Sequence, residues 1–264
     1  MQFREETVFS LFSTIKSQLI VPDFQRAYLW ENDQCRDFFN DLYEHSKSES
    51  NYSFGNIFVE ENSDVSKTEI VDGLQRLATI VIFIRSLVDV LKEQKKLAHN
   101  DFNIEEMKRT FIKHNGKSKL AVSKIDQKYF ENVILENGES NVKSESQERM
   151  RKAKQYFLRK IESVESVSEL KNIYEKLQKS IITITIIDNK TDSTLMFELQ
   201  NNRGKYKNQY KRQNDKNSKG VPTSELIDNV YRLASMGWKM DEISTVFNLS
   251  IGEVELILEL RSKT

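Results

Sequence analysis

Hydrophobic and polar residues follow helix and strand periods through most of this chain, beginning near the N-terminus. Residues 5–17 place apolar side chains on one face at helical spacing, which predicts a helix. The segment "LIVPDF" that follows is expected to be extended, because Pro22 disfavours helix for the residue before it. A second helix is expected to run from a cap at Asn32 or Asp33 to about Lys47. Its buried apolar residues are expected to be Cys35, Phe38, Phe39 and Leu42.

Two runs of β-branched and aromatic residues, at 52–61 and 67–72, predict neighbouring strands joined by a hairpin loop. The next segment carries a long apolar stripe at helical spacing, which predicts a strongly amphipathic helix. This stripe consists of Leu77, Ile80, Val81, Ile84, Leu87, Val88 and Leu91. A later β-branched run at 180–188 alternates little, as in a strand that is buried on both faces.

The region from about 100 to 178 is heavily charged and mostly helical in pattern, with a flexible loop expected at 137–148. A further helix is expected from about Asp192 to the "NNRG" segment, where Gly204 suits a C-terminal cap. Together these elements predict an α+β protein with a small sheet, an added helical region and a short helical unit at the C-terminus.

Composition narrows the class of protein. The 264 residues include 40 basic and 40 acidic side chains, so net charge favours no class of partner, and the low proline content favours a helix-rich soluble protein. A single cysteine, Cys35, excludes an internal disulfide and fits a reducing cytoplasm. No signal peptide and no membrane partner are expected. The first residues lack a basic region followed by an apolar one, and charges interrupt the longest apolar stretch, 77–91.

A basic segment at 205–220 separates the main region, 1–204, from a compact C-terminal unit at 221–264. The segment holds six lysines or arginines against one aspartate and has no aliphatic residue. This composition is typical of a solvated linker, and a nucleic-acid contact is the alternative.

The C-terminal unit has the spacing of a helix-turn-helix, with Ser250 as the expected cap of the second helix. The charged residues of that helix before Arg261 are Glu253, Glu255 and Glu259. A recognition helix normally brings positive charge to DNA, whereas this unit holds four basic and seven acidic residues. A protein contact or a purely structural role is therefore favoured over DNA binding.

Two stretches combine a Gln-Arg pair with strand and helix patterns. In "VPDFQRAYLW" (21–30), Gln25 and Arg26 follow an extended segment, and an arginine can fork onto a phosphate while a glutamine orients it. The alternative is a strand-to-helix connection whose aromatic residues anchor the core.

The second stretch is "VDGLQRLATI" (71–80). Asp72 at a strand end can hold a metal or polarise a water, and Gly73 allows a positive φ or a close backbone approach. The first amides of the following helix, near Gln75 and Arg76, suit a bound phosphate. The alternative is a simple Asp-Gly turn that leads into a helix.

These stretches occur in the order that is typical of a known family, which the chain resembles. This is the N-terminal domain family of GmrSD-type restriction systems, a ParB-like domain of prokaryotic defence proteins. Residues 21–30 match its (V/I)-P-x-(F/Y)-Q-R-x-Y-x-W stretch at every specified position. Residues 70–80 match its (I/V)-(V/I)-D-G-Q-Q-R-L-x-T-I stretch except at Leu74. "FELQNNRG" (197–204) approaches a third stretch, F-x-x-(I/L)-N-x-R-G, through Phe197, Asn201, Arg203 and Gly204, and a helix C-cap is the alternative.

The resemblance implies a ParB/sulfiredoxin-like α+β domain over residues 1–204, with the helical region at about 100–178 as an insertion. It implies a nucleotide-hydrolysing or DNA-acting component of a modification-dependent restriction system that defends against phage. The implied catalytic residues are Asp72, Arg76 and Arg26. The implied nucleotide-binding residues are Gln25, Gly73, Gln75, Asn201 and Arg203, and no separate metal-ligand set is implied. The cofactor is not fixed by the sequence, and magnesium with a nucleoside triphosphate is the candidate.

Two departures from the family bear on activity. Leu74 stands where the family has a glutamine, which would matter if that side chain contacts the substrate and matter little if it faces the core. The three histidines are scattered, so no HNH nuclease domain is expected, and cutting of modified phage DNA would come from a separate nuclease subunit. A catalytically inactive binding or regulatory protein on the same fold is the alternative function.

Overall fold

The computed structural model describes most of the chain in two units. The described residues are 2–14, 18–22, 27–62, 67–93, 102–187, 224–235, 238–247 and 249–261. The units span Met1–Lys190 and Thr191–Thr264. Several predicted features lie outside the described residues: the helix expected near Asp192, the boundary at 204, the basic segment 205–220, and Gln25, Arg26, Asn201 and Arg203.

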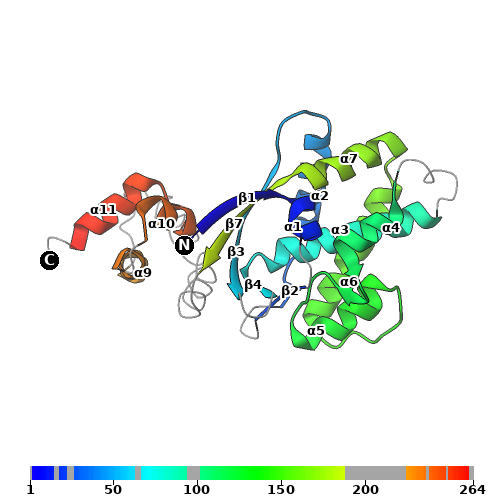
Figure 1. Ribbon diagram of the computed structural model, residues 1–264, viewed down its shortest axis with the longest axis horizontal. Coiled ribbons are helices and arrows are strands. Elements are labelled where there is room, and N and C mark those ends of the chain that lie inside the picture. Colours follow the sequence, from blue (N-terminus) through cyan, green and yellow to red (C-terminus); the bar gives the residue numbers. More distant parts are fainter. Residues whose placement is uncertain are drawn as a thin grey trace. The chain divides into compact units, whose positions relative to one another are not determined.

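A mixed sheet forms one side of the first unit (Figure 1). Its strands are β1 (Gln2–Thr7), β2 (Leu19–Ile20), β3 (Ser53–Asn62), β4 (Lys67–Asp72) and β7 (Ile181–Ile187), in the order β1-β7-β3-β4-β2. β1 pairs with β7 and β3 with β4 in antiparallel fashion, whereas β2 runs parallel to β4 and β3 parallel to β7. The predicted α+β class is confirmed, and the finer likeness to ParB and sulfiredoxin folds stays a prediction.

The first helix begins later than its apolar pattern predicts, and its expected end at 15–17 lies outside the described residues. Helix α1 spans Val8–Thr14, and the preceding residues form β1 instead of its first turn. Residues 2–7 pair along their whole length with β7, so backbone pairing to a distant strand overrides the local helical spacing. The apolar face is nevertheless as expected, because Val8, Leu11 and Phe12 are all buried.

The second helix, α2, spans Asn32–Ser46 and buries the four apolar residues expected of it. Its N-cap is Glu31, so the predicted cap at Asn32 or Asp33 is wrong. The Glu31 side chain accepts a hydrogen bond from the backbone amide of Gln34, the third residue of the helix. The Gln34 side chain in turn accepts from the backbone amide of Glu31. This reciprocal capping box satisfies two backbone donors, which explains why the helix begins one residue earlier than predicted.

Helix α3, Leu74–Glu93, is the central helix of the first unit. Its expected apolar stripe is buried, but so are most residues between the stripe positions. A helix that is buried on nearly all sides lies inside the unit and does not present a polar face to water. In Figure 1 the helices of this unit lie mainly to the right of the sheet, with α3 passing among them.

The charged region is mostly helical, as predicted. It contains α4 (Ile104–Met107), the π-helical segment η1 (Lys108–Ile112), β5 (Lys113–His114), β6 (Lys117–Ser118), α5 (Lys124–Tyr129), the π-helical segment η2 (Phe130–Leu135), α6 (Glu145–Glu162) and α7 (Val167–Lys179). The loop expected at 137–148 is shorter than predicted, because Ser144 caps α6 by accepting from the amide of Gln147 at 3.2 Å. β7 leaves no residue exposed, in agreement with a strand covered on both faces.

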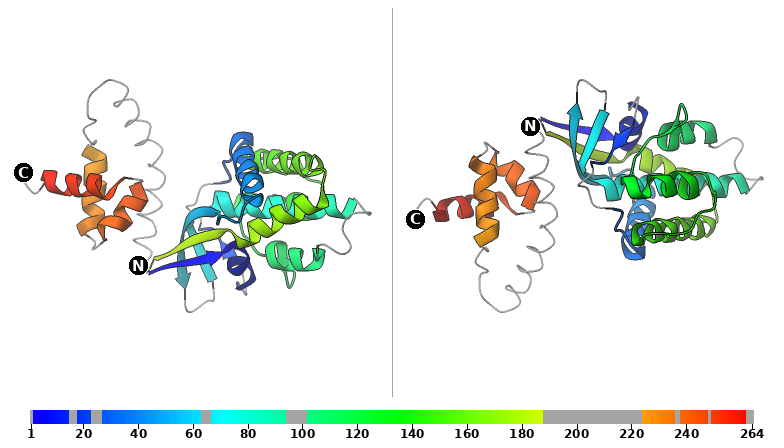
Figure 2. Two further views of the ribbon diagram at one scale, coloured as in Figure 1. Left: turned by 90° about the horizontal axis from the view of Figure 1, so that it is seen from above. Right: turned by 90° about the horizontal axis from the view of Figure 1, so that it is seen from below.

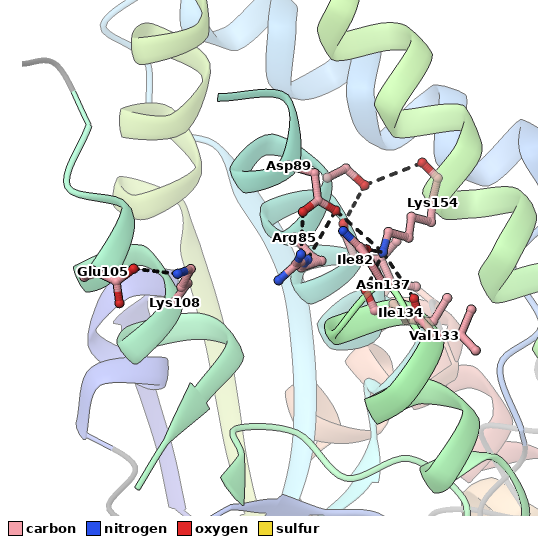
Figure 3. A network of polar contacts seen from close by, with 10 residues as sticks. Ile82, Arg85, Asp89, Glu105, Lys108, Val133, Ile134, Asn137 and Lys154 are labelled. Carbon is pink, nitrogen blue, oxygen red and sulfur yellow. Dashed lines mark hydrogen bonds and ion pairs between the residues drawn. The ribbon is translucent and has the colours of Figure 1, made fainter. Parts of the chain in front are cut away.

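A buried polar cluster fixes α3 against η2 and α6 (Figure 3). Arg85 and Asp89 pair within α3, and Lys154 of α6 lies 3.6 Å from the Asp89 carboxylate. The Lys154 ammonium also donates to the carbonyl of Ile134 at 2.6 Å and to the side chain of Asn137. Burial lowers the pKa of Lys154 to about 8 against the opposing effect of Asp89. The cluster therefore joins three helical segments through charges that are paired or hydrogen-bonded.

The second unit contains α9 (Ser224–Ser235), α10 (Met240–Phe247) and α11 (Ile251–Arg261), which lie against one another in both views of Figure 2. Ile243 of α10 and Val254 of α11 are fully buried between them. The predicted Ser250 cap is present, because its hydroxyl accepts from the amide of Glu253 at 3.2 Å. Among the helices that the structure describes, none has the length and apolar run needed to cross a membrane.

Candidate functional site

The first two motif stretches begin at the same edge of the sheet. β2 and β4 are parallel neighbours, with Leu19 opposite Thr68 and Ile20 opposite Glu69. The first stretch, from Val21, continues directly from β2, and the second reaches α3 directly from β4. Because parallel strands end at the same edge, the fold brings together two motifs that are some 50 residues apart in sequence.

Gly73 makes the sharp connection from β4 to α3. Its φ is +119°, and a Cβ built at this position would lie only 2.5 Å from the Ile57 side chain on β3. Both the backbone conformation and the close approach therefore require glycine. Asp72, the preceding residue, is half-buried and pairs opposite Phe58 at the end of the β3–β4 ladder.

The first turn of α3 is suited to an anion. The amide of Leu77 donates to the Gly73 carbonyl at 3.1 Å, so the amides before it are the donors that a helix start leaves without intrahelical partners. This turn contains no acidic residue and carries the positive charge of Arg76. An arginine here opposes the helix dipole, whereas a bound anion would complement both charge and dipole.

The Arg76 side chain is half-buried, and a hydrogen bond from its guanidinium group to the backbone fixes its position. Its guanidinium donates to the carbonyl of Asn56, near the start of β3. Its guanidinium carbon lies 4.0 Å from the position that a Cβ would take on Gly55. Within the described residues Arg76 forms no ion pair with a carboxylate, so its charge is not neutralised by a neighbouring side chain there.

Gln75 joins the two motifs. Its amide nitrogen donates to the carbonyl of Ala27 at 3.0 Å, and its amide oxygen accepts from the amide of Leu29 at 2.7 Å. The side chain thus binds the backbone of the first motif on both sides of Tyr28. This geometry gives Gln75 a positioning role, and its implied contact with a nucleotide stays a prediction.

A second link lies one turn further along α3. The Tyr28 hydroxyl and the Thr79 hydroxyl are 2.9 Å apart in a hydrogen bond, and Tyr28 is buried. The Tyr28 amide donates to the Ser146 hydroxyl at 3.0 Å, which ties the same motif to α6. Burial raises the pKa of Tyr28 well above its usual value, so its phenol is neutral and structural.

This second link was not foreseen from the sequence, although both hydroxyl residues occupy specified motif positions. Tyr28 is the Tyr of the first motif and Thr79 the Thr of the second. The available signal was Thr79, a hydroxyl residue within the long apolar run of the second motif. A hydroxyl that is buried among apolar residues needs a hydrogen-bond partner.

Leu74 faces the core. Its side chain is only 1% exposed and belongs to the main apolar cluster of the first unit. Of the two alternatives that its departure from the family pattern left open, the structure favours the one in which this position packs inside. A glutamine here would bury an amide among apolar groups.

Two depressions in the described part of the first unit share the start of α6 in their lining. One, of about 700 Å3, is lined by the starts of α2 and α6, including Glu31 and Lys152. The other, of about 610 Å3, is lined by motif residues and by the starts of α5 and α6. Asp72, Gly73 and Arg76 line neither of them.

The described residues contain no group of three or more histidine, cysteine, aspartate or glutamate side chains placed to hold a metal. Asp72 is the single carboxylate of the second motif. Magnesium in nucleotide sites is commonly held by one or two carboxylates together with phosphate oxygens, so this residue set fits a metal that arrives with its nucleotide.

The fold and this arrangement define an α+β protein with an anion-suited helix start at the carboxyl ends of two parallel strands. Comparison with known protein families shows which family the chain belongs to. The model of the family described as the GmrSD restriction endonuclease N-terminal domain matches residues 8–214, and the chain belongs to this family. The resemblance noted from the motifs is thus confirmed, and it implies a component of a restriction system. A search of curated proteins found no match.

Proposed function

We propose that the site binds a nucleoside triphosphate at the start of α3 and hydrolyses it as part of a restriction system. The observation that carries the proposal is Arg76, which stands in the first turn of α3 without a carboxylate partner among the described residues. Helix amides and one arginine together supply the charge stabilisation that phosphoryl transfer requires.

The first motif supplies further charge in this proposal. Arg26 directly precedes Ala27, whose carbonyl accepts from Gln75 in the first turn of α3. A second arginine beside the phosphates would stabilise the negative charge that spreads over the transferred group. We assign Gln25 to orienting the attacking water, and Asn201 and Arg203 to further phosphate contacts, on the strength of the family motifs.

Asp72 has the remaining role. In the proposal it holds magnesium jointly with phosphate oxygens, and the metal would neutralise phosphate charge when bound. Asp72 is the last residue of β4 and precedes the glycine that fixes the start of α3, so it lies at the sheet edge where the two motifs meet. This position supports the assignment.

The proposal extends to partners. Nucleotide turnover would gate the cutting of modified phage DNA in the cytoplasm, with the cutting done by a separate nuclease subunit. The second unit is proposed to contact protein, because Glu255 on α11 is exposed together with Ile251 and Leu256, and this mixed acidic and apolar surface does not suit DNA.

The test is hydrolysis of GTP and ATP by the wild type, Asp72→Ala and Leu74→Gln, each with and without modified DNA. The proposal predicts turnover of at least one nucleotide by the wild type and at least about a tenfold loss in Asp72→Ala. Absence of turnover in every condition, with no gain from Leu74→Gln, would contradict hydrolysis.

A binding protein without catalysis is the second candidate, and the observation that favours it is the loss of the family glutamine at Leu74. The burial of Leu74 weakens this argument, because a side chain inside the core does not contact substrate. Nucleotide binding without turnover in the same experiment would support this candidate.

A further inference from the structure

The depression of about 610 Å3 beside the first motif has a size that is common for small-molecule sites. Its lining includes the motif residues Pro22, Ala27 and Leu29, here called the motif wall, and Ile125 at the start of α5. Ile125 is 80% exposed and Leu29 is 41% exposed. Two large apolar side chains that face one open depression form a surface suited to a flat apolar partner.

The motif wall is attached to the proposed phosphate site. Both hydrogen bonds of the Gln75 amide end on this wall, one at the Ala27 carbonyl and one at the Leu29 amide. Gln75 itself is in the first turn of α3. The first turn of α3 and the lining of the depression are therefore joined directly through this one side chain.

The depression and the first turn of α3 differ in formal charge. Lys124, Asp126, Glu145 and Arg149 line the depression, so its formal charges cancel, whereas the first turn of α3 is positive and lacks an acid. A triphosphate favours the positive helix start, and an uncharged group favours the neutral apolar depression. We propose that the depression holds the nucleobase of the nucleotide whose phosphates bind at α3, an inference that rests on the proposed function.

The polar groups of the depression are already engaged. Asp126 is buried and accepts from Ser123 and Ser144, each at 2.9 Å. Arg149 pairs with Glu31 at 3.4 Å and with Glu145 at 3.1 Å. With these groups committed, contact with the faces of the base dominates over hydrogen bonds to its edges. The site is therefore expected to hold ATP and GTP with affinities that differ by less than about tenfold.

The experiment measures binding of ATP and of inorganic tripolyphosphate by calorimetry to the whole chain. The test variant is Leu29→Ser with Ile125→Ser, which removes apolar surface from partly exposed positions and keeps the backbone bond of Leu29. The control is Phe3→Ser, a comparably exposed apolar residue on β1. Far-ultraviolet circular dichroism and thermal midpoints establish that each variant is folded.

The wild type and the control are expected to bind ATP at least about tenfold more tightly than tripolyphosphate. The test variant should lose about fivefold or more in ATP affinity, with less than a twofold change for tripolyphosphate. If the wild type binds both ligands but the test variant loses affinity for neither, or for both equally, the inference is overturned and the proposed function stands. If the wild type binds neither ligand, the proposed function fails and the inference falls with it.

Discussion

Replacing Leu74 with glutamine restores the residue that the family has at this position and tests whether the position belongs to the core. The side chain is 1% exposed, beside the glycine that starts α3. The substitution loses the burial of a leucine, worth about 1.5–3 kcal/mol, and inserts an amide among apolar groups at about 1–3 kcal/mol. We expect the free energy of unfolding of the first unit to fall by about 3–5 kcal/mol.

A loss of this size lowers the midpoint of thermal unfolding by about 6–20 °C for a unit of this length. The measurement needs a signal from the first unit alone. The chain has two tryptophans, Trp30 in the first unit and Trp238 in the second, so a Trp238→Phe background leaves Trp30 fluorescence as the reporter.

The matched control is Leu74→Met, which conserves volume and should cost less than about 1.5 kcal/mol. A Leu74→Gln variant that unfolds within about 0.5 kcal/mol of the wild type would refute the reasoning, because it would mean that the glutamine finds polar partners or reaches the surface. The position would then again be a candidate for substrate contact.

Three further predictions concern stability. Tyr28→Phe and Thr79→Val should each cost about 1–2 kcal/mol in urea unfolding, and the double variant should cost less than their sum; strict additivity would show that the hydrogen bond does not form. Gly73→Ala should destabilise by at least about 2 kcal/mol, whereas Gly116→Ala, which also has a positive φ but open space around it, should cost about 1 kcal/mol; equal costs would contradict the close approach at Gly73. Burial lowers the pKa of Lys154 from 10.5 to about 8, so the unfolded chain binds more protons than the folded chain between these values. Stability relative to Lys154→Met should therefore rise by up to about 3 kcal/mol from pH 8 to pH 10.5, and a pH-independent difference would contradict this burial.

The sequence predicted the elements that follow local rules. The strands at 52–61 and 67–72, the long helix after Gly73 and the capped helix at Ser250 all appear close to their expected positions. Apolar periodicity and turn chemistry are local signals, so neighbouring residues are enough to specify these elements. The strand β1 was missed because its pairing with β7 depends on residues at the other end of the first unit. The cap at Glu31 and the shorter loop before α6 were missed although the capping contacts that set them are local.

The candidate site likewise combines local features, which the sequence predicted, with long-range contacts, which it did not. The motifs indicated that Asp72, Gly73 and Arg76 belong together, because they follow one another in sequence. The pairing of Gln75 with the backbone of the first motif could not be predicted, since it depends on β2 lying beside β4. The same holds for the depression beside Leu29, part of whose lining comes from a helix start nearly 100 residues later.

The most direct test of the central claim is calorimetric binding of a nucleoside triphosphate to the wild type, Arg76→Gln and Arg36→Gln. Arg36 is an exposed arginine on α2 that pairs with Asp33, so its substitution makes the same chemical change away from the motifs. A charged hydrogen bond contributes about 1.5–3 kcal/mol, so Arg76→Gln should bind about 10- to 150-fold more weakly while Arg36→Gln binds like the wild type. Equal affinities in all three proteins, or no binding by the wild type, would contradict a nucleotide site at the start of α3.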